Sequence, residues 1–140
     1  GANHYAAILI PFISTITTIT LVYLIGNKIA NERIGLLAAF LLAIFPLNIR
    51  YSTMLEADVV ISSMMGICYL LYLSRFKDSK YFLIGAIIGV GIFIKLFIGL
   101  LILLFSIDLC RRKEFKNVSF LFLGFIFYAF FSIVLISKLF

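Results

Sequence analysis

Two carboxylates, Glu56 and Asp58, stand two residues apart in a polar stretch that has apolar runs on both sides. Charges are costly in apolar surroundings unless water, a metal ion or an opposite charge meets them. Oxygen ligands at this spacing could bind a divalent cation, and one carboxylate could act as a general base. At the start of a helix they would simply favour the helix dipole, with Asp58 as the cap. Both interpretations stay open, and the two acids are the candidate catalytic or metal-binding residues.

Two cations are candidate partners for an anion. Arg50 lies in the same polar stretch, residues 48–58, and could pair with the acids, face a phosphate or extend to lipid headgroups. Lys95 lies inside an apolar run, where a lysine commonly marks a functional site. An anion such as a lipid phosphate is its natural partner. The alternative is a lysine at a re-entrant turn that only reaches the headgroups.

Composition places these residues in a membrane. Of the 140 residues, 64% are hydrophobic and 13% are charged, against roughly 45–50% and about 25% in soluble domains. The net charge of +6 reflects twelve Lys and Arg residues against six Asp and Glu. Such an excess usually marks cytoplasmic loops, so no nucleic-acid partner is expected. We predict an all-α, multi-pass integral protein of the cytoplasmic membrane, a helix bundle of about five to six membrane segments with short loops.

Apolar runs separated by polar connectors give the predicted elements. Pro46 interrupts the second run, and we interpret residues 48–58 as a loop with Asp58 at the mouth of the next helix. Hydroxyls in the first run, and the pair Gly85 and Gly89, are typical of helix packing. The runs are 5–27, 36–47, 59–73, 81–109 and 118–139.

Lys95 divides the longest run, residues 81–109. Residues 75–80 hold three basic residues and one acid, and residues 111–116 hold four and one. Two basic loops around a single crossing would break the positive-inside pattern, so we predict two segments that turn near Lys95. The predicted cytoplasmic connectors are 26–35, 75–80 and 110–117, with 48–58 and Lys95 on the opposite side.

Several stretches resemble a known family when they are taken together in order. They are Leu21–Gly26, Asn31–Pro46, Tyr51-Ser52, Asp58 and Gly91-Ile92-Phe93-Ile94-Lys95. Over residues 14–105 the chain resembles the GT-C membrane glycosyltransferases that use polyprenyl-phosphate sugars, the protein mannosyltransferase and aminoarabinose transferase group. Ile94 and Leu96 depart from the Leu-Thr-Lys-Gly stretch of that group. Glu56-Ala57-Asp58 is also similar to the second acidic motif of oligosaccharyltransferase catalytic subunits, but Lys95 favours the first group.

The resemblance implies a function and roles for four residues. A polyprenyl-phosphate sugar would be the donor, attacked on the extracytoplasmic side with the lipid phosphate as leaving group. Asp58 falls on the acidic position after the Tyr-Ser pair, and Lys95 falls on the lysine near the lipid phosphate. Arg50 would help Lys95 to steady the phosphate. Glu56 and Asp58 would position the acceptor or a divalent cation.

One departure from the family concerns its main catalytic acid, which lies in a large loop upstream of the stretch that matches here. Family members are also several times longer. We therefore expect residues 1–140 to form a single transmembrane domain that is part of a larger GT-C domain. We expect this chain to be inactive alone, and other membrane subunits are candidate partners. The alternative is a non-catalytic membrane scaffold or a small transporter subunit, with Glu56 and Asp58 as helix caps.

Overall fold

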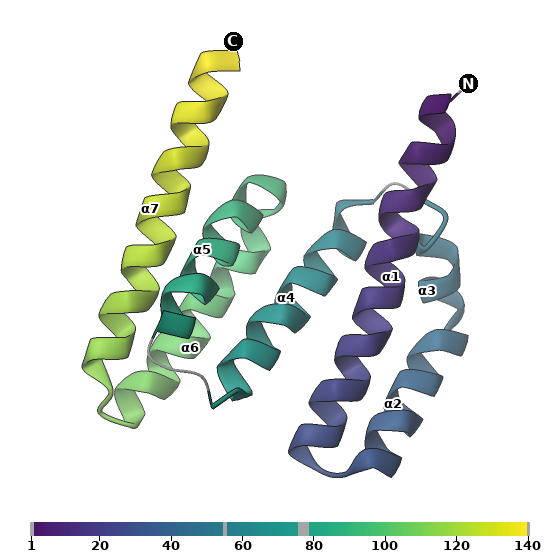
Figure 1. Cartoon of the computed structure of the whole chain (residues 1–140), viewed down its shortest axis with the longest axis horizontal. Coiled ribbons are helices and arrows are strands. Elements are labelled where there is room, and N and C mark those ends of the chain that lie inside the picture. The colour runs from purple at the N-terminus through teal and green to yellow at the C-terminus, as the bar shows by residue number, and fades with distance from the viewer. Residues whose placement is uncertain (1, 55, 76–78, 140) are drawn as a thin grey trace. The chain divides into compact units, whose positions relative to one another are not determined.

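The computed structural model describes residues 2–54, 56–75 and 79–139. Within these residues the chain is all-helical, with seven α-helices and one 3-10 helix (Figure 1). It forms two compact units, residues 1–73 and residues 74–140. The prediction of an all-α fold with short connections is therefore confirmed.

The first unit contains α1 (Ala2–Ile29), α2 (Glu32–Ile44), α3 (Pro46–Tyr51) and α4 (Ala57–Leu73). Helix α1 packs against both α2 and α4. Apolar side chains of α1 and α4 form the core of this unit, because one stripe of each helix faces the other. The most buried of them are Pro11, Leu21, Val59, Ile61 and Cys68.

The turn between α1 and α2 is shorter than the predicted connector. Both helices extend into residues 26–35, and only Ala30 and Asn31 lie between them. The Asn31 side chain caps α2, because its Oδ1 accepts a hydrogen bond from the Ile34 N–H at 2.9 Å. A Cβ atom on Gly26 would lie 2.8 Å from the Cα of Gly35. The two glycines therefore let the helices approach closely beside the turn.

Hydroxyl groups along α1 bond to their own backbone, as the sequence suggested. Thr17, Thr18 and Thr20 donate to the carbonyl oxygens four residues earlier, at 2.8, 2.8 and 2.9 Å. Such bonds satisfy a hydroxyl inside an apolar helix without any partner from outside.

The second unit contains α5 (Ser79–Ile94), a 3-10 helix η1 (Leu96–Gly99), α6 (Leu100–Arg111) and α7 (Phe115–Leu139). Helix α5 packs along α7 at a glycine contact. A Cβ atom on Gly85 would collide with the Leu121 carbonyl oxygen, and one on Gly124 with that of Phe82. The predicted packing role of Gly85 is confirmed, although its partner is on α7.

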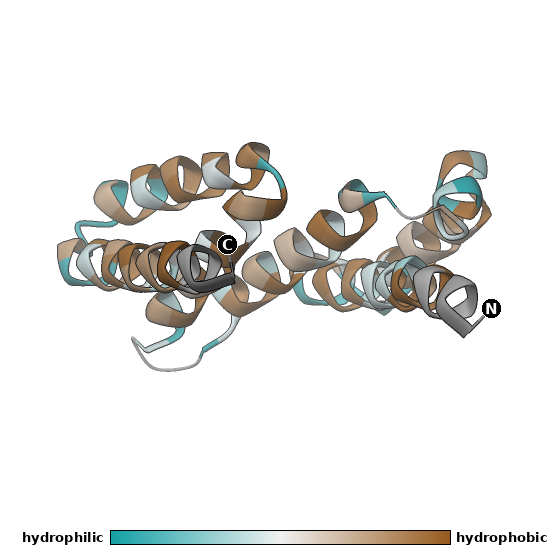
Figure 2. Ribbon diagram, turned by 90° about the horizontal axis from the view of Figure 1, so that it is seen from above, coloured by the Kyte–Doolittle hydropathy of each residue, from teal (hydrophilic) through white to brown (hydrophobic). Residues whose placement is uncertain are grey.

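Apolar side chains cover much of the outer surface of these helices. Figure 2 shows hydrophilic residues gathered at the turns and hydrophobic residues along the helices. By length and composition, one described helix can cross a membrane, at Ile8–Ile29, while Ala57–Leu73, Ser79–Ile94 and Phe115–Tyr128 are shorter apolar helices. One such helix leaves the predicted five to six membrane segments unconfirmed.

Candidate functional site

The helix break at Phe45 and Pro46 lies directly before the polar stretch, residues 48–58. Phe45 ends α2 and precedes α3 with extended backbone angles, φ −65° and ψ 121°. A residue before proline avoids the helical region, and proline has no N–H to donate. The Leu42 carbonyl, four residues before Pro46, therefore loses its usual donor. Two other donors replace it: Asn48 Nδ2 donates to the Leu42 oxygen at 3.0 Å, and the Phe45 N–H donates to the same oxygen at 3.3 Å.

The predicted loop 48–58 is wrong in its first half. Residues up to Tyr51 belong to α3, so Arg50 lies in the last turn of a short helix, with its side chain exposed. Six residues are too few to show helical periodicity in a sequence. The hydroxyls that follow end the helix: Ser52 Oγ donates to the Ile49 oxygen at 2.7 Å, and Thr53 Oγ1 to the Arg50 oxygen at 2.9 Å.

Asp58 is exposed in the first turn of α4, which begins at Ala57. The interpretation of Asp58 as the residue that precedes and caps the helix is therefore wrong, because Glu56 occupies that place. Ser62 Oγ donates to the Asp58 backbone carbonyl at 2.7 Å. A carboxylate in a first turn is favourable to the helix dipole and stays accessible to a ligand. Position alone permits both roles.

Glu56 is half-buried directly before α4, and its N–H donates to the Met54 oxygen at 2.8 Å. In the described part of the chain, no group of three or more His, Cys, Asp or Glu side chains could hold a metal ion. Glu56 and Asp58 together offer two carboxylates. Magnesium uses one or two carboxylates when substrate phosphates and water supply the other ligands, so the donor chemistry of this pair fits such an ion.

Lys95 lies at the predicted break between two helical segments, and this prediction is confirmed. Helix α5 ends at Ile94, Lys95 is extended with φ −158° and ψ 126°, and η1 and α6 follow. The Lys95 N–H still donates to the Gly91 oxygen at 2.9 Å, and its carbonyl accepts from Ile98 at 3.3 Å. Figure 1 shows α5 and α6 running in opposite directions on either side of this tip.

Apolar side chains surround the Lys95 position on the surface of the tip. Leu96 is 79% exposed and Phe97 is 60% exposed, and Phe93 and Ile94 are also exposed. A cation among exposed apolar groups suits a boundary between hydrocarbon and polar surroundings. The chemistry available at this tip is binding of an anion carried by an apolar molecule.

The structure brings Arg50, Glu56 and Asp58 into one segment of the first unit, while Lys95 belongs to the second unit. Sequence reasoning missed the structural role of Asn48. The signal was available, because a proline deprives the carbonyl four residues earlier of its donor, and an amide two residues after it can reach back.

These features describe an apolar, all-helical chain that has two acids at the start of one helix and a lysine at a helix break. The sequence profile of the dolichyl-phosphate-mannose-protein mannosyltransferase family matches residues 1–136. The chain belongs to this family of GT-C type membrane glycosyltransferases. No curated protein and no solved structure shows significant similarity to it.

Proposed function

We propose that the chain is part of a membrane glycosyltransferase that transfers a sugar from a polyprenyl-phosphate donor to an extracytoplasmic acceptor. Membership of the mannosyltransferase family over residues 1–136 is the observation that carries this proposal. The positions of Asp58 and Lys95 support it, because an exposed acid and an exposed cation supply the two kinds of group that such a reaction uses. One group lies in each unit, and the two roles are separate proposals.

Asp58, with Glu56, acts on the acceptor. The acceptor hydroxyl oxygen bonds to the anomeric carbon while the bond from that carbon to the phosphate oxygen breaks, which inverts the configuration. The phosphate leaves with the bonding electrons, and the carboxylate takes the hydroxyl proton. A divalent cation would be held by Glu56 and Asp58 in the first unit, where it would supply positive charge.

Lys95 acts on the lipid phosphate. Its cation stabilises the negative charge that the leaving phosphate gains, and a preorganised charge in a low-dielectric site is worth more than in water. Arg50 is the second candidate for this role. The surrounding Leu96 and Phe97 suit the apolar chain that carries the phosphate.

The membrane arrangement is part of the proposal. We infer a multi-pass protein of the cytoplasmic membrane, with α5 and α6 as a re-entrant pair. Within the first unit, the α1–α2 turn and the α3–α4 segment lie at opposite ends of the helices, and within the second unit the Lys95 tip and the α6–α7 turn do so (Figure 1). In each unit the candidate residues thus lie opposite a basic turn, as the positive-inside pattern requires.

The test is sugar transfer by the whole protein in reconstituted membranes, with a polyprenyl-phosphate mannose donor. Asp58→Asn keeps the side-chain size and removes the charge, and Lys95→Gln does the same for the cation. We expect each to lower the transfer rate by about 10²–10³, the usual loss when one preorganised contact is removed. Unfolding temperature is measured on the same samples.

Glu32→Gln is the matched control for Asp58→Asn, because Glu32 is also an exposed acid in the first turn of a helix. Lys28→Gln controls for Lys95→Gln, since Lys28 is an exposed lysine in a helical last turn. Both controls should transfer sugar at the wild-type rate. Full activity with a lowered unfolding temperature in Asp58→Asn would make the residue structural, as the scaffold alternative requires.

A further inference from the structure

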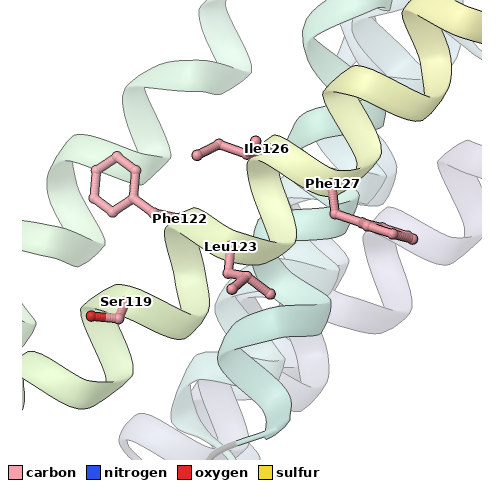
Figure 3. A pocket seen from close by; sticks show the side chains of 5 residues that line it. All are labelled: Ser119, Phe122, Leu123, Ile126 and Phe127. Carbon is pink, nitrogen blue, oxygen red and sulfur yellow. The ribbon is translucent and has the colours of Figure 1, made fainter.

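Helix α7 carries an apolar groove that the proposed reaction does not use. It has a volume of about 570 Å³ and is lined by Ser119, Phe122, Leu123, Ile126 and Phe127. Ligand pockets generally measure roughly 300–1,000 Å³. Figure 3 shows these side chains projecting from successive turns of one helix, with Ser119 at one end of the row.

The walls of this groove are partly fixed and partly exposed. The Phe127 ring packs against Phe82 of α5, with ring centroids 6.2 Å apart, and against Tyr128 at 5.4 Å. Leu123 and Ile126 are 59% and 61% exposed. From Ser119 to Phe127 the groove extends roughly 12 Å along the helix axis. That length is close to one leaflet, which is half of the roughly 30 Å hydrocarbon core.

The polar end of the groove adjoins a basic turn. Lys116 lies three residues before Ser119, hence on the same face of α7, and its Nζ lies 5.8 Å from the Phe120 ring centroid. The preceding turn adds Arg111, Arg112 and Lys113, all exposed. Arg112 pairs with Asp108 at 2.9 Å. The cations Arg111, Arg112, Lys113 and Lys116 outnumber the acids Asp108 and Glu114 by two, so one end of the otherwise apolar groove carries net positive charge.

The backbone at Lys113 closes the basic turn between α6 and α7. Lys113 has φ 59°, in the left-handed region that favours glycine. It holds the last turn of α6 closed, because Lys113 N donates to the Cys110 oxygen and Glu114 N to the Leu109 oxygen, both at 3.0 Å. A lysine in this conformation is less stable than a glycine would be.

We propose that the groove and the basic turn bind one anionic phospholipid, with its phosphate at the turn and one acyl chain along α7. The charge selects an anionic headgroup over a zwitterionic one, and the aromatic wall accepts the chain. A basic patch at the cytoplasmic end of membrane helices attracts acidic lipids by about 1 kcal/mol for each Lys or Arg, which corresponds to about a fivefold preference.

The experiment reconstitutes the whole protein in phosphatidylcholine vesicles that contain a photoactivatable phospholipid with the reactive group on an acyl chain. One probe is a phosphatidylglycerol and the other is a phosphatidylcholine with the same chains. Cross-linked peptides are mapped by mass spectrometry. We expect the phosphatidylglycerol probe to label residues 119–127 several-fold more than the phosphatidylcholine probe does.

Two variants of the turn separate binding from folding. Lys116→Gln should reduce labelling by phosphatidylglycerol about fivefold and leave labelling by phosphatidylcholine unchanged. Lys113→Gly should reduce it by a similar factor while the unfolding temperature rises, because glycine relieves the left-handed conformation. Lys28→Gln removes the same charge in the first unit and should change nothing at residues 119–127.

Three results would overturn the proposal. Equal labelling by the two probes would show that the groove receives bulk lipid without regard to charge. If labelling by phosphatidylglycerol is unchanged in both Lys116→Gln and Lys113→Gly, the basic turn does not contribute to lipid binding in the groove. Disulfide-linked dimers of a Leu123→Cys variant, without lipid labelling at residues 119–127, would make the groove a contact between two copies of the chain.

Discussion

The first unit breaks its helix at Phe45 and Pro46, the second at Lys95, and the causes of the two breaks differ. At the first, proline removes a donor and the Asn48 amide restores it to the Leu42 carbonyl. At the second, no proline lies in residues 81–109, and the extended backbone of Lys95 separates the two helical segments. The first break is explained by local covalent structure and local repair, and the second is not.

The difference indicates what each break is for. A helix end leaves its last carbonyl groups without helical donors, and in hydrocarbon such groups are costly. In the first unit, the Asn48 side chain supplies a donor to one of these carbonyl groups, that of Leu42. The tip of the second unit combines an exposed lysine with exposed Leu96 and Phe97, which suits a boundary between hydrocarbon and polar surroundings. We therefore propose a structural role for the break at Pro46 and a ligand-facing role for the break at Lys95.

The largest expected effect concerns how each unit holds its helices together. In Gly85→Ala the new Cβ atom meets the Leu121 backbone oxygen, which cannot move alone. In Gly66→Ala it meets side-chain atoms of Leu21, Cδ1 at 3.0 Å and Cβ at 3.3 Å. We expect Gly85→Ala to destabilise the protein by about 3 kcal/mol. Gly66→Ala should be neutral or stabilising, since alanine favours helix by about 1 kcal/mol.

Thermal unfolding in detergent compares the two variants directly. Both replace a helical glycine with alanine, so the difference between their unfolding temperatures isolates the helix contact. Equal unfolding temperatures would show that α5 and α7 can separate without loss, and that the second unit is not held at Gly85.

The next effect tests the repair at Pro46. Asn48→Leu leaves the Leu42 carbonyl without its amide donor, and we expect a loss of about 1–2 kcal/mol. In a Pro46→Ala background the new N–H can donate to Leu42, so the same substitution should cost under about 0.5 kcal/mol. Unfolding free energies of the four proteins complete this double-mutant cycle. An unchanged cost of Asn48→Leu in the alanine background would reject the repair.

The smallest effect tests the surroundings of the Lys95 tip. On a background with Cys68→Ala and Cys110→Ser, Lys95→Cys and Leu103→Cys each place one thiol on an exposed position. Leu103 lies within α6, and Lys95 lies at the break. We expect a water-soluble maleimide to label position 95 about tenfold faster than position 103, because thiolate forms in water and not in hydrocarbon. Similar rates would place the tip in hydrocarbon and contradict its ligand-facing role.

The sequence allowed the helices to be predicted better than the polar segments between them. The break at Lys95 could be predicted because an intramembrane lysine and two basic flanks both require it. Helix α3 could not, because it is only six residues long and depends on a proline and two hydroxyls more than on periodicity. Part of the predicted connector 75–80, with Lys77 and Asp78, lies outside the described residues. The assignments of Glu56, Asp58, Arg50 and Lys95 to chemistry remain predictions, since position alone does not separate a helix-favouring acid from a catalytic one.

The two-residue turn between α1 and α2 has a consequence for membrane insertion. Helix α2 has 13 residues, so it is roughly 20 Å long against a hydrocarbon core of about 30 Å. Alone it would partition poorly, but the glycine contact beside the turn lets it enter as a hairpin with α1, which is long and apolar enough. Translation in the presence of microsomes should therefore give membrane integration of residues 1–47 as one unit, and a reporter fused to residues 30–47 alone should stay extractable by alkali.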